Sequence, residues 1–401
     1  MVGAPEWWYV VDSQNSLFFT ILMFLIDVPI MLIMFFVAGY FAMPSLVKRG
    51  PDKFLKDKFI RIGIPWIVGV LFLAPLTAYM AYIRWGSPVT YLQFWSSDFW
   101  GVAFQQSVYW YLGVLFVLFF LLVLAYDISD RLHAAQRRVS MPTWKLFLSF
   151  WVIMTLGMLL MNQFFPIDTW HTQVKLVVFQ PLRVPLYIGY FALGIYSLLN
   201  GWFAAEGYQP HLLPWLGVWF VSGLLYLGNR LFVLPANPDP ALFIQAAHAI
   251  LFNTFCLSSL LAGTAFFQKY VNGSGPIWSS LSANSYGIYY VHPLILYPVA
   301  YLFLPVSLPL FVKAPLVILL GLVPRLAGYG RFDYLQLLVN REGHTLGLGK
   351  NLFLGFGNGA GPAGPAFCKF GPQFLFFLQL AVDELALDIA HLVAFTGLPH
   401  G

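Results

Sequence analysis

Residues 17–43 read LFFTILMFLIDVPIMLIMFFVAGYFAM, and Asp27 is the only charged residue in that run. An α-helix rises about 1.5 Å per residue, so about 20 apolar residues cross the hydrocarbon core of a bilayer. Comparable runs recur near residues 62–83, 107–126, 145–165, 176–199, 212–234, 243–267, 286–304 and 306–323. The sequence therefore predicts an all-α integral membrane protein, a bundle of about nine transmembrane helices.

The composition excludes a soluble domain. Of 401 residues, 60% are hydrophobic and only 9% are charged, whereas soluble domains carry about 25% charged residues. Too few polar side chains exist to cover a water-facing surface. The apolar runs also lack the alternation that transmembrane β-barrels need. No nucleic-acid partner is expected, because the positive residues lie mostly in loops on one side, where they act as topology signals.

Basic residues mark one side of the predicted bundle. The segment after the first run holds Lys48, Arg49, Lys53, Lys56, Lys58 and Arg61, and the segment after the third holds Arg131, Arg137, Arg138 and Lys145. The alternate segments carry only Arg84 and Lys175, and residues 235–242 carry no Lys or Arg. By the positive-inside rule the basic segments face the cytoplasm. We expect a multi-pass protein of the cell membrane.

Two parts are expected along the chain. Residues 1–323 form the helical membrane domain. Residues 324–401 form a tail, and its stretch HTLGLGKNLFLGFGNGAGPAGPAFCKFG favours irregular backbone because it is rich in glycine and proline. A later apolar stretch of the tail contains three acidic residues, which favours an amphipathic surface helix over a tenth span. Cys256 and Cys368 have no metal-site spacing, and we expect no bound metal or cofactor.

Three segments carry a family resemblance. Residues 35–65, FFVAGYFAMPSLVKRGPDKFLKDKFIRIGIP, resemble the F-F-x-S-G-Y-F…F-L-x-x-R-x-x-R-L-x-x-P segment of the membrane acyltransferase 3 family. Residues 107–119, SVYWYLGVLFVLF, resemble its H-x-W-F-L-x-x-L-L block, and residues 281–293, LSANSYGIYYVHP, resemble its S-x-x-S-Y-x-I-Y-L-x-H-x-P block. The resemblance covers residues 5–322 and is nearest to the branch that includes glucan-modifying enzymes.

The resemblance implies a ten-helix fold and an acyl transfer. Family members move an acyl group, here expected to be of the acetyl or succinyl class, from cytoplasmic acyl-CoA to a hydroxyl of a carbohydrate or glucan. Acyl-CoA is then a donor substrate rather than a resident cofactor. The family's first span carries a basic residue and a catalytic histidine, whereas the first histidine in this sequence is His133. We therefore interpret the chain as lacking the first family helix, which leaves its catalytic competence open.

Lys58 and Arg61 are the candidates for binding the donor. They match the family's R-x-x-R pair, and their spacing places them on one face of a helix. Positive charge there can hold a CoA phosphate, with Arg61 as a bidentate fork and Lys58 as a point charge. The alternative is that both residues only anchor the cytoplasmic end of a helix.

His292 is the candidate catalytic base. It lies in an apolar run beside Pro293, and imidazole accepts a proton at neutral pH. Ser285 and Tyr286 are nearby candidates for hydrogen bonding. A hydrogen-bonded packing role is the alternative for His292. For His248, which no motif supports, the sequence predicts a structural role.

Trp110 and Arg183 are candidates for the outer, acceptor side. Arg183 is a charge in or near a span, which is costly unless it is compensated, and Asp27 is the expected opposite charge. A structural ion pair and a contact with the acceptor sugar both explain Arg183. Trp110 belongs to a family block and can stack on a carbohydrate, whereas membership of an interfacial aromatic belt is the alternative.

Two other functions compete with an acyltransferase. A transporter or flippase of a polar or lipid-linked solute would also have many spans, but the sequence shows no internal repeat with matching broken helices. A non-catalytic remnant that still inserts into the membrane would differ only in activity. The family resemblance favours the acyltransferase.

Overall fold

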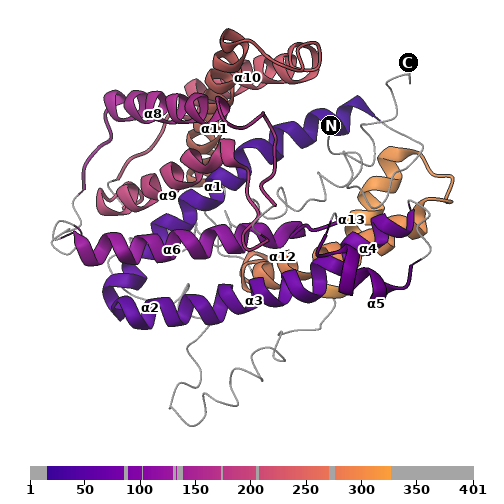
Figure 1. Cartoon of the computed structure of the whole chain (residues 1–401). Helices are drawn as coiled ribbons and strands as arrows, with labels where there is room; N and C mark the ends of the chain where they lie inside the picture. Colours follow the sequence, from indigo (N-terminus) through magenta and orange to yellow (C-terminus); the bar gives the residue numbers. More distant parts are fainter. Residues whose placement is uncertain are drawn as a thin grey trace.

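The computed structural model describes residues 16–84, 89–101, 103–129, 132, 139–172, 175–204, 207–270 and 276–326, without the side chains of Thr20, Met23, Arg84 and residues 276–285 and 321–326. The α-helices (Figure 1) are α1 (Leu17–Arg49), α2 (Pro51–Lys58), α3 (Ile64–Val68), α4 (Ala74–Arg84), α5 (Tyr91–Gln93), α6 (Trp110–Ile128), α8 (Trp144–Asn162), α9 (Val184–Leu199), α10 (Leu212–Gly228), α11 (Leu242–Tyr270), α12 (Pro276–Phe303) and α13 (Leu310–Leu326). π-helical turns are η2 (Phe59–Gly63), η3 (Gly69–Leu73), η4 (Phe94–Asp98) and η7 (Asn229–Val233), and 3-10 turns are η5 (Ser107–Tyr109) and η6 (Pro181–Arg183). Apart from the end of α13, the predicted tail lies outside the described residues.

Each predicted apolar run corresponds to helical structure. Among the described residues, seven helical stretches are long and apolar enough to cross a membrane: Leu17–Arg49, Pro51–Ile83, Ser107–Ile128, Trp144–Asn162, Pro181–Leu199, Leu212–Val233 and Leu242–Tyr270. The two last predicted runs coincide with α12 and α13. Large apolar side chains such as Phe72, Phe120 and Phe220 are exposed on these helices, as expected where lipid is the solvent. The fold is that of an all-α integral membrane protein, as predicted.

The helix α1 occupies the middle of the bundle. In Figure 1 it runs between a group formed by α8, α9, α10 and α11 and a second group that contains α2, α3, α6 and α12. It packs most extensively on α9, and it also contacts α11 and α6. Because α1 contacts both groups, its packing determines how the two groups are placed.

The crossing of α1 and α9 brings two backbones into contact. A Cβ added at Gly39 would lie 2.0 Å from the carbonyl oxygen of Phe191, and one added at Gly194 would lie 2.0 Å from the carbonyl oxygen of Phe36. Glycines allow such close approach, and small residues are a common means of helix packing in membranes. Gly39, which belongs to the family-like segment at residues 35–65, therefore has a packing role.

The second span begins earlier than the sequence predicted. Gly50, with a φ of +79°, ends α1, and Pro51 opens α2 directly after it. Glycine tolerates this left-handed backbone, and proline suits the first turn of a helix because an N–H is not needed there. Helical structure then continues to Arg84. As a result, Lys58 and Arg61 lie about two to three turns inside the second helical stretch instead of at its entrance.

The fifth span begins later than predicted. Residues 176–180 are not helical, and the N–H of His171 donates to the carbonyl of Phe179 at 2.8 Å across a short hairpin. The side chain of Gln106 binds this hairpin at two backbone positions. Pro181 then starts η6 and the helix. The hairpin between α8 and α9 is thereby fixed against the start of α6.

Candidate functional site

A cationic cluster lies where α1 ends and α2 begins. Asp57 pairs with Arg49 at 2.8 Å and with Nε of Arg61 at 3.0 Å. Lys58 lies beside them, with its Nζ 4.7 Å from the centre of the Phe119 ring. These charged side chains are partly exposed, and three cations face one carboxylate. A cluster of this kind, with excess positive charge and access to solvent, suits a ligand that carries phosphate.

The predicted donor residue Arg61 lies in the π-helical turn η2. Within this turn the N–H of Ile64 donates to the carbonyl of Phe59, five residues earlier. In a regular α-helix the carbonyl of Arg61 would accept from residue 65, but Pro65 has no N–H. The hydroxyl of Tyr286, on α12, donates to that carbonyl at 2.9 Å. The structure thus places Tyr286 directly against the backbone of Arg61.

The helix α12 also holds His292. Two residues before it, Tyr290 donates to the carbonyl of Pro65 at 2.9 Å, and three residues before it Tyr289 donates to the carbonyl of Val108 in η5. The Nδ1 atom of His292 is 2.7 Å from the carbonyl oxygen of Tyr289. Because a carbonyl can only accept, Nδ1 carries a proton, and Nε2 keeps a lone pair when the ring is neutral. The Tyr289 ring lies 6.1 Å from His292 and 6.3 Å from Tyr111.

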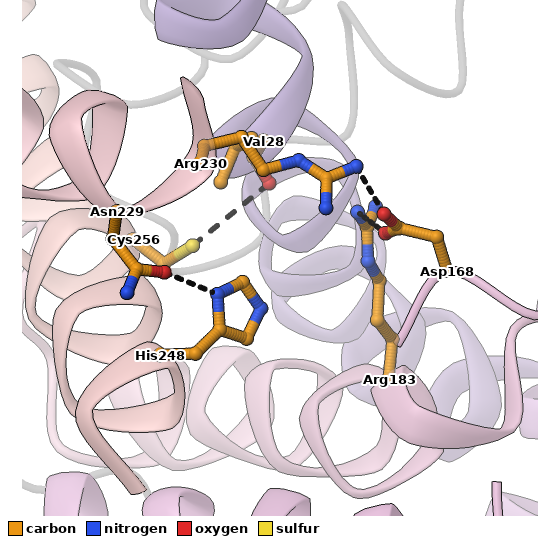
Figure 2. Close-up of polar contacts among 7 residues, drawn as sticks. All are labelled: Val28, Asp168, Arg183, Asn229, Arg230, His248 and Cys256. Carbon is orange, nitrogen blue, oxygen red and sulfur yellow. Dashed lines mark hydrogen bonds and ion pairs between the residues drawn. The ribbon is translucent and has the colours of Figure 1, made fainter. Parts of the chain in front are cut away.

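A second polar cluster lies toward the predicted outer ends of the helices (Figure 2). Asp168, in the loop between α8 and α9, pairs with Arg230 of η7, and its carboxylate is 3.7 Å from Arg183. Burial alone would raise the pKa of the Asp168 carboxyl, but the charges of Arg230 and Arg183 outweigh it and hold the pKa below its usual range. Asp27, which the sequence suggested as a partner of Arg183, interacts with it electrostatically from α1. Arg183 therefore interacts with both Asp168 and Asp27.

His248 and Asn229 lie beside this outer cluster. The Oδ1 atom of Asn229 is 3.2 Å from Nδ1 of His248, and both side chains are buried. The imidazole lies 5.8 Å from the Tyr226 ring and 6.0 Å from the Phe252 ring. With this amide orientation Nδ1–H donates to Asn229, and the other ring nitrogen faces the side of Arg183 (Figure 2). His248 is therefore held in one orientation by packing and by a hydrogen bond.

Trp110 links the outer cluster to an aromatic surface. Its ring lies 5.8 Å from the ring of Tyr187, which follows Arg183 by one helical turn, and 5.2 Å from the ring of Trp170. Trp110 itself is buried, whereas Trp170 is 42% exposed. A row of ring contacts therefore runs from the exposed Trp170 through Trp110 to Tyr187, one helical turn after Arg183.

The match to a protein family favours one of the functional alternatives. Residues 3–328 match the acyltransferase 3 family, which is described as an acyltransferase domain. The chain belongs to the acyltransferase 3 family. No curated protein and no solved structure matches it. The chain is accordingly a membrane acyltransferase by family, and the match gives no support to a transporter or flippase.

In this acyltransferase 3 protein the predicted site residues fall into two groups. Lys58, Arg61 and Tyr286 lie together near the start of the second span, and Trp110 and Arg183 lie toward the outer cluster. His292 lies on α12, six residues after Tyr286, and contacts the carbonyl of Tyr289. Ser285 belongs to the backbone of α12, but its side chain lies outside the described residues.

Sequence reasoning gave no functional role to several residues of the outer cluster. Asp168 lies in a loop without a motif, and it becomes prominent only because two arginines from different helices converge on it. Asn229 and Arg230 lie in the π-helical turn η7. Such turns are frequent at functional sites, but the sequence pattern did not reveal this one. Asp57, four residues before Arg61, is a local signal that could have predicted their ion pair from the sequence.

Proposed function

We propose that this acyltransferase 3 protein is an enzyme of the cell membrane that transfers an acyl group from acyl-CoA to a hydroxyl of a carbohydrate. The observation that carries the proposal is the cationic cluster around Lys58 and Arg61, because CoA phosphates require fixed positive charge. Its position beside the basic segment after α1 agrees with a cytoplasmic location, where acyl-CoA is available.

The proposed reaction needs a base. The acceptor hydroxyl oxygen bonds to the carbonyl carbon of the thioester, the carbon–sulfur bond breaks, and the hydroxyl proton passes to the CoA thiolate. His292 suits the transfer of that proton because Nδ1–H is held by the carbonyl of Tyr289 and Nε2 can accept. The Tyr289 ring is near both His292 and Tyr111, which adjoins Trp110 on the outer side.

The acceptor is proposed to approach from the outer cluster. Trp170 offers an exposed aromatic ring in contact with Trp110, and Arg183 supplies donors for hydroxyl or anionic groups. A glucan acceptor and an acyl group of the acetyl or succinyl class follow from the branch resemblance. This side of the protein offers a flat aromatic surface and charged hydrogen-bond donors. A sugar ring can stack on the first and accept hydrogen bonds from the second through its hydroxyls.

Membranes that contain the protein are expected to transfer label from radiolabelled acetyl-CoA or succinyl-CoA to glucans. Arg61→Ala should raise the KM for acyl-CoA at least about tenfold, because a charge-assisted hydrogen bond contributes about 1.5–3 kcal/mol. The kcat should change little, since Arg61 is proposed to hold the donor phosphate and not the reacting atoms. Initial rates over a range of acyl-CoA concentrations measure both quantities.

Lys56→Ala is the matched control for Arg61→Ala. Lys56 is an exposed cation on the same helical segment, and its removal should leave the KM for acyl-CoA within about twofold. An unchanged KM in Arg61→Ala would place the donor site elsewhere. No transfer above that of empty membranes would favour the non-catalytic remnant, and exchange of labelled solute across sealed vesicles would favour a transporter.

His292→Gln is expected to lower kcat by about 100-fold or more, because general base catalysis contributes about 100- to 10,000-fold. Glutamine preserves much of the side-chain volume and a donor for the carbonyl of Tyr289, but it cannot accept a proton at neutral pH. The KM for acyl-CoA should stay within about threefold. Single-turnover rates with preloaded acyl-CoA measure the chemical step directly.

His248→Gln is the informative comparison for His292→Gln. Its Nδ1 is held in a similar way, by Asn229, but its ring packs between Tyr226 and Phe252. We expect this variant to lose less than about tenfold in kcat. The reverse ranking of the two variants would move the catalytic base from His292 to His248.

A further inference from the structure

The hydrogen bond between Tyr286 and Arg61 replaces a missing backbone donor. The carbonyl of Arg61 would be paired with residue 65 in an α-helix, and Pro65 removes that N–H. The hydroxyl of Tyr286 supplies a donor at 2.9 Å, from a helix far away in the sequence. Tyr286 is partly buried and packs against the hydrophobic core of the bundle. A buried carbonyl without a partner is costly, which makes this contact a strong constraint.

We infer that Tyr286 is a positioning residue that fixes the backbone of Arg61, and therefore its guanidinium group, for the acyl-CoA phosphate. This inference rests on the proposed donor-binding role of Arg61. The guanidinium is already held on one side, because its Nε pairs with Asp57 at 3.0 Å. The hydroxyl of Tyr286 holds the other end of the same residue at the main chain. With both ends held, the remaining N–H groups of Arg61 have a defined direction.

The same contact couples the donor site to the helix of the proposed base. Tyr286 stands six residues before His292 on α12, which corresponds to a rise of about 9 Å along the helix. The π-helical turn η2, in which Arg61 lies, interrupts the regular hydrogen bonding of the second span. The hydroxyl of Tyr286 therefore adds a contact from α12 to the backbone of Arg61, which ties the donor cation to the helix that carries His292.

Tyr290 provides a matched control one turn further along α12. Its hydroxyl donates to the carbonyl of Pro65 at 2.9 Å, in the same geometry as the contact of Tyr286 with Arg61. The carbonyl of Pro65 also accepts from the N–H of Gly69. Removal of the Tyr290 hydroxyl therefore leaves a carbonyl that still has a backbone donor. Removal of the Tyr286 hydroxyl takes away the donor that stands in for the missing N–H of Pro65.

Tyr286→Phe is expected to raise the KM for acyl-CoA about five- to tenfold, which corresponds to the loss of one hydrogen bond that orients the ligand-binding group. The kcat and the KM for the glucan acceptor should stay within about twofold. Tyr290→Phe should leave all three parameters within about twofold. Steady-state kinetics with acetyl-CoA or succinyl-CoA in membranes measure the difference. A purely structural role for Tyr286 would lower the amount of active protein and kcat, and would not shift the KM for acyl-CoA alone.

Pro65→Ala in the Tyr286→Phe background tests whether the loss of affinity for acyl-CoA comes from the Arg61 carbonyl losing its donor. Alanine restores an N–H that can pair with the carbonyl of Arg61, so the double variant should recover at least half of the lost affinity for acyl-CoA. In an Arg61→Ala background, Tyr286→Phe should change the KM by less than about twofold, because the group that it positions is gone. An equal effect in both backgrounds would overturn the inference.

The proposed function and this inference fail in different ways. If Arg61→Ala leaves the KM for acyl-CoA unchanged, the donor site itself is wrong. If Arg61→Ala raises that KM but Tyr286→Phe does not, the donor site stands and only the positioning role of Tyr286 is lost. Should Tyr286→Phe accumulate poorly, the affinity of its purified folded fraction for acetyl-CoA, measured beside that of Pro65→Ala/Tyr286→Phe, supplies the same decision: weaker binding in the single variant than in the double variant supports the role, and equal binding in both contradicts it.

Discussion

Gly194→Leu is expected to prevent the protein from accumulating in a folded form. A Cβ at this position would lie 2.0 Å from the carbonyl oxygen of Phe36 and 2.8 Å from the backbone nitrogen of Tyr40. Both are main-chain atoms, so no side-chain rotation relieves the overlap. The helices α1 and α9 would have to separate, at a cost of at least about 3 kcal/mol. Because α1 contacts both groups of helices, the change should affect the whole bundle.

Detergent extraction followed by size-exclusion chromatography measures this effect. The variant should give little or no monodisperse peak, and any recovered protein should have a much lower Tm than the wild type. Gly217→Ala is the matched control, because Gly217 is also inside a membrane helix and a Cβ there meets nothing within 4 Å. It should be neutral or slightly stabilising, since alanine favours a helix by about 1 kcal/mol over glycine. A normal yield of Gly194→Leu would show that α1 and α9 do not cross as closely as described.

The helices of this protein could be predicted well because the bilayer imposes a length. Each run of about 20 apolar residues must be helical to satisfy its backbone inside lipid, whatever it packs against. The ends were less predictable. The basic residues before residue 62 looked like a loop, but Pro51 starts a helix that carries them, and the apolar residues 176–180 form part of a hairpin instead of a span.

The candidate site was only partly predictable. Lys58, Arg61 and Tyr286 were found through segments that resemble a family, and the structure brings the last two together. Asp168 and Arg230 had no such segment, and their importance comes from a contact across more than sixty residues of sequence. Local patterns report helix faces and ends, whereas the meeting of side chains from separate helices depends on tertiary packing.

Asp168→Asn is expected to disable the outer cluster. The substitution removes the negative charge on which Arg183 and Arg230 converge and leaves two guanidinium groups facing a neutral amide. Breaking a fully buried ion pair costs about 3–5 kcal/mol, and the partial exposure of this cluster reduces the expected loss to about 2 kcal/mol. The two arginines should also turn away from their present positions. We therefore expect the KM for the glucan acceptor to rise at least about tenfold while the KM for acyl-CoA stays within about twofold.

Asp98→Asn is the control, because Asp98 is another acid on the outer side and its side chain accepts from hydroxyls, those of Tyr82 and Ser97, instead of pairing with arginines. The amide oxygen of asparagine can still accept the hydrogen bond from Tyr82. This variant should leave both KM values unchanged.

The pH dependence of stability tests whether Asp168 is ionised when it pairs with the two arginines. The pKa of Asp168 is lowered in the folded protein, so its contribution to stability is complete above the usual carboxyl range and is lost only as pH falls through the lowered value. Between pH 5 and 8 the stability difference between wild type and Asp168→Asn should therefore be constant. A difference that shrinks as pH falls from 7 to 5 would mean that Asp168 is protonated in that range and does not hold the two arginines as an ion.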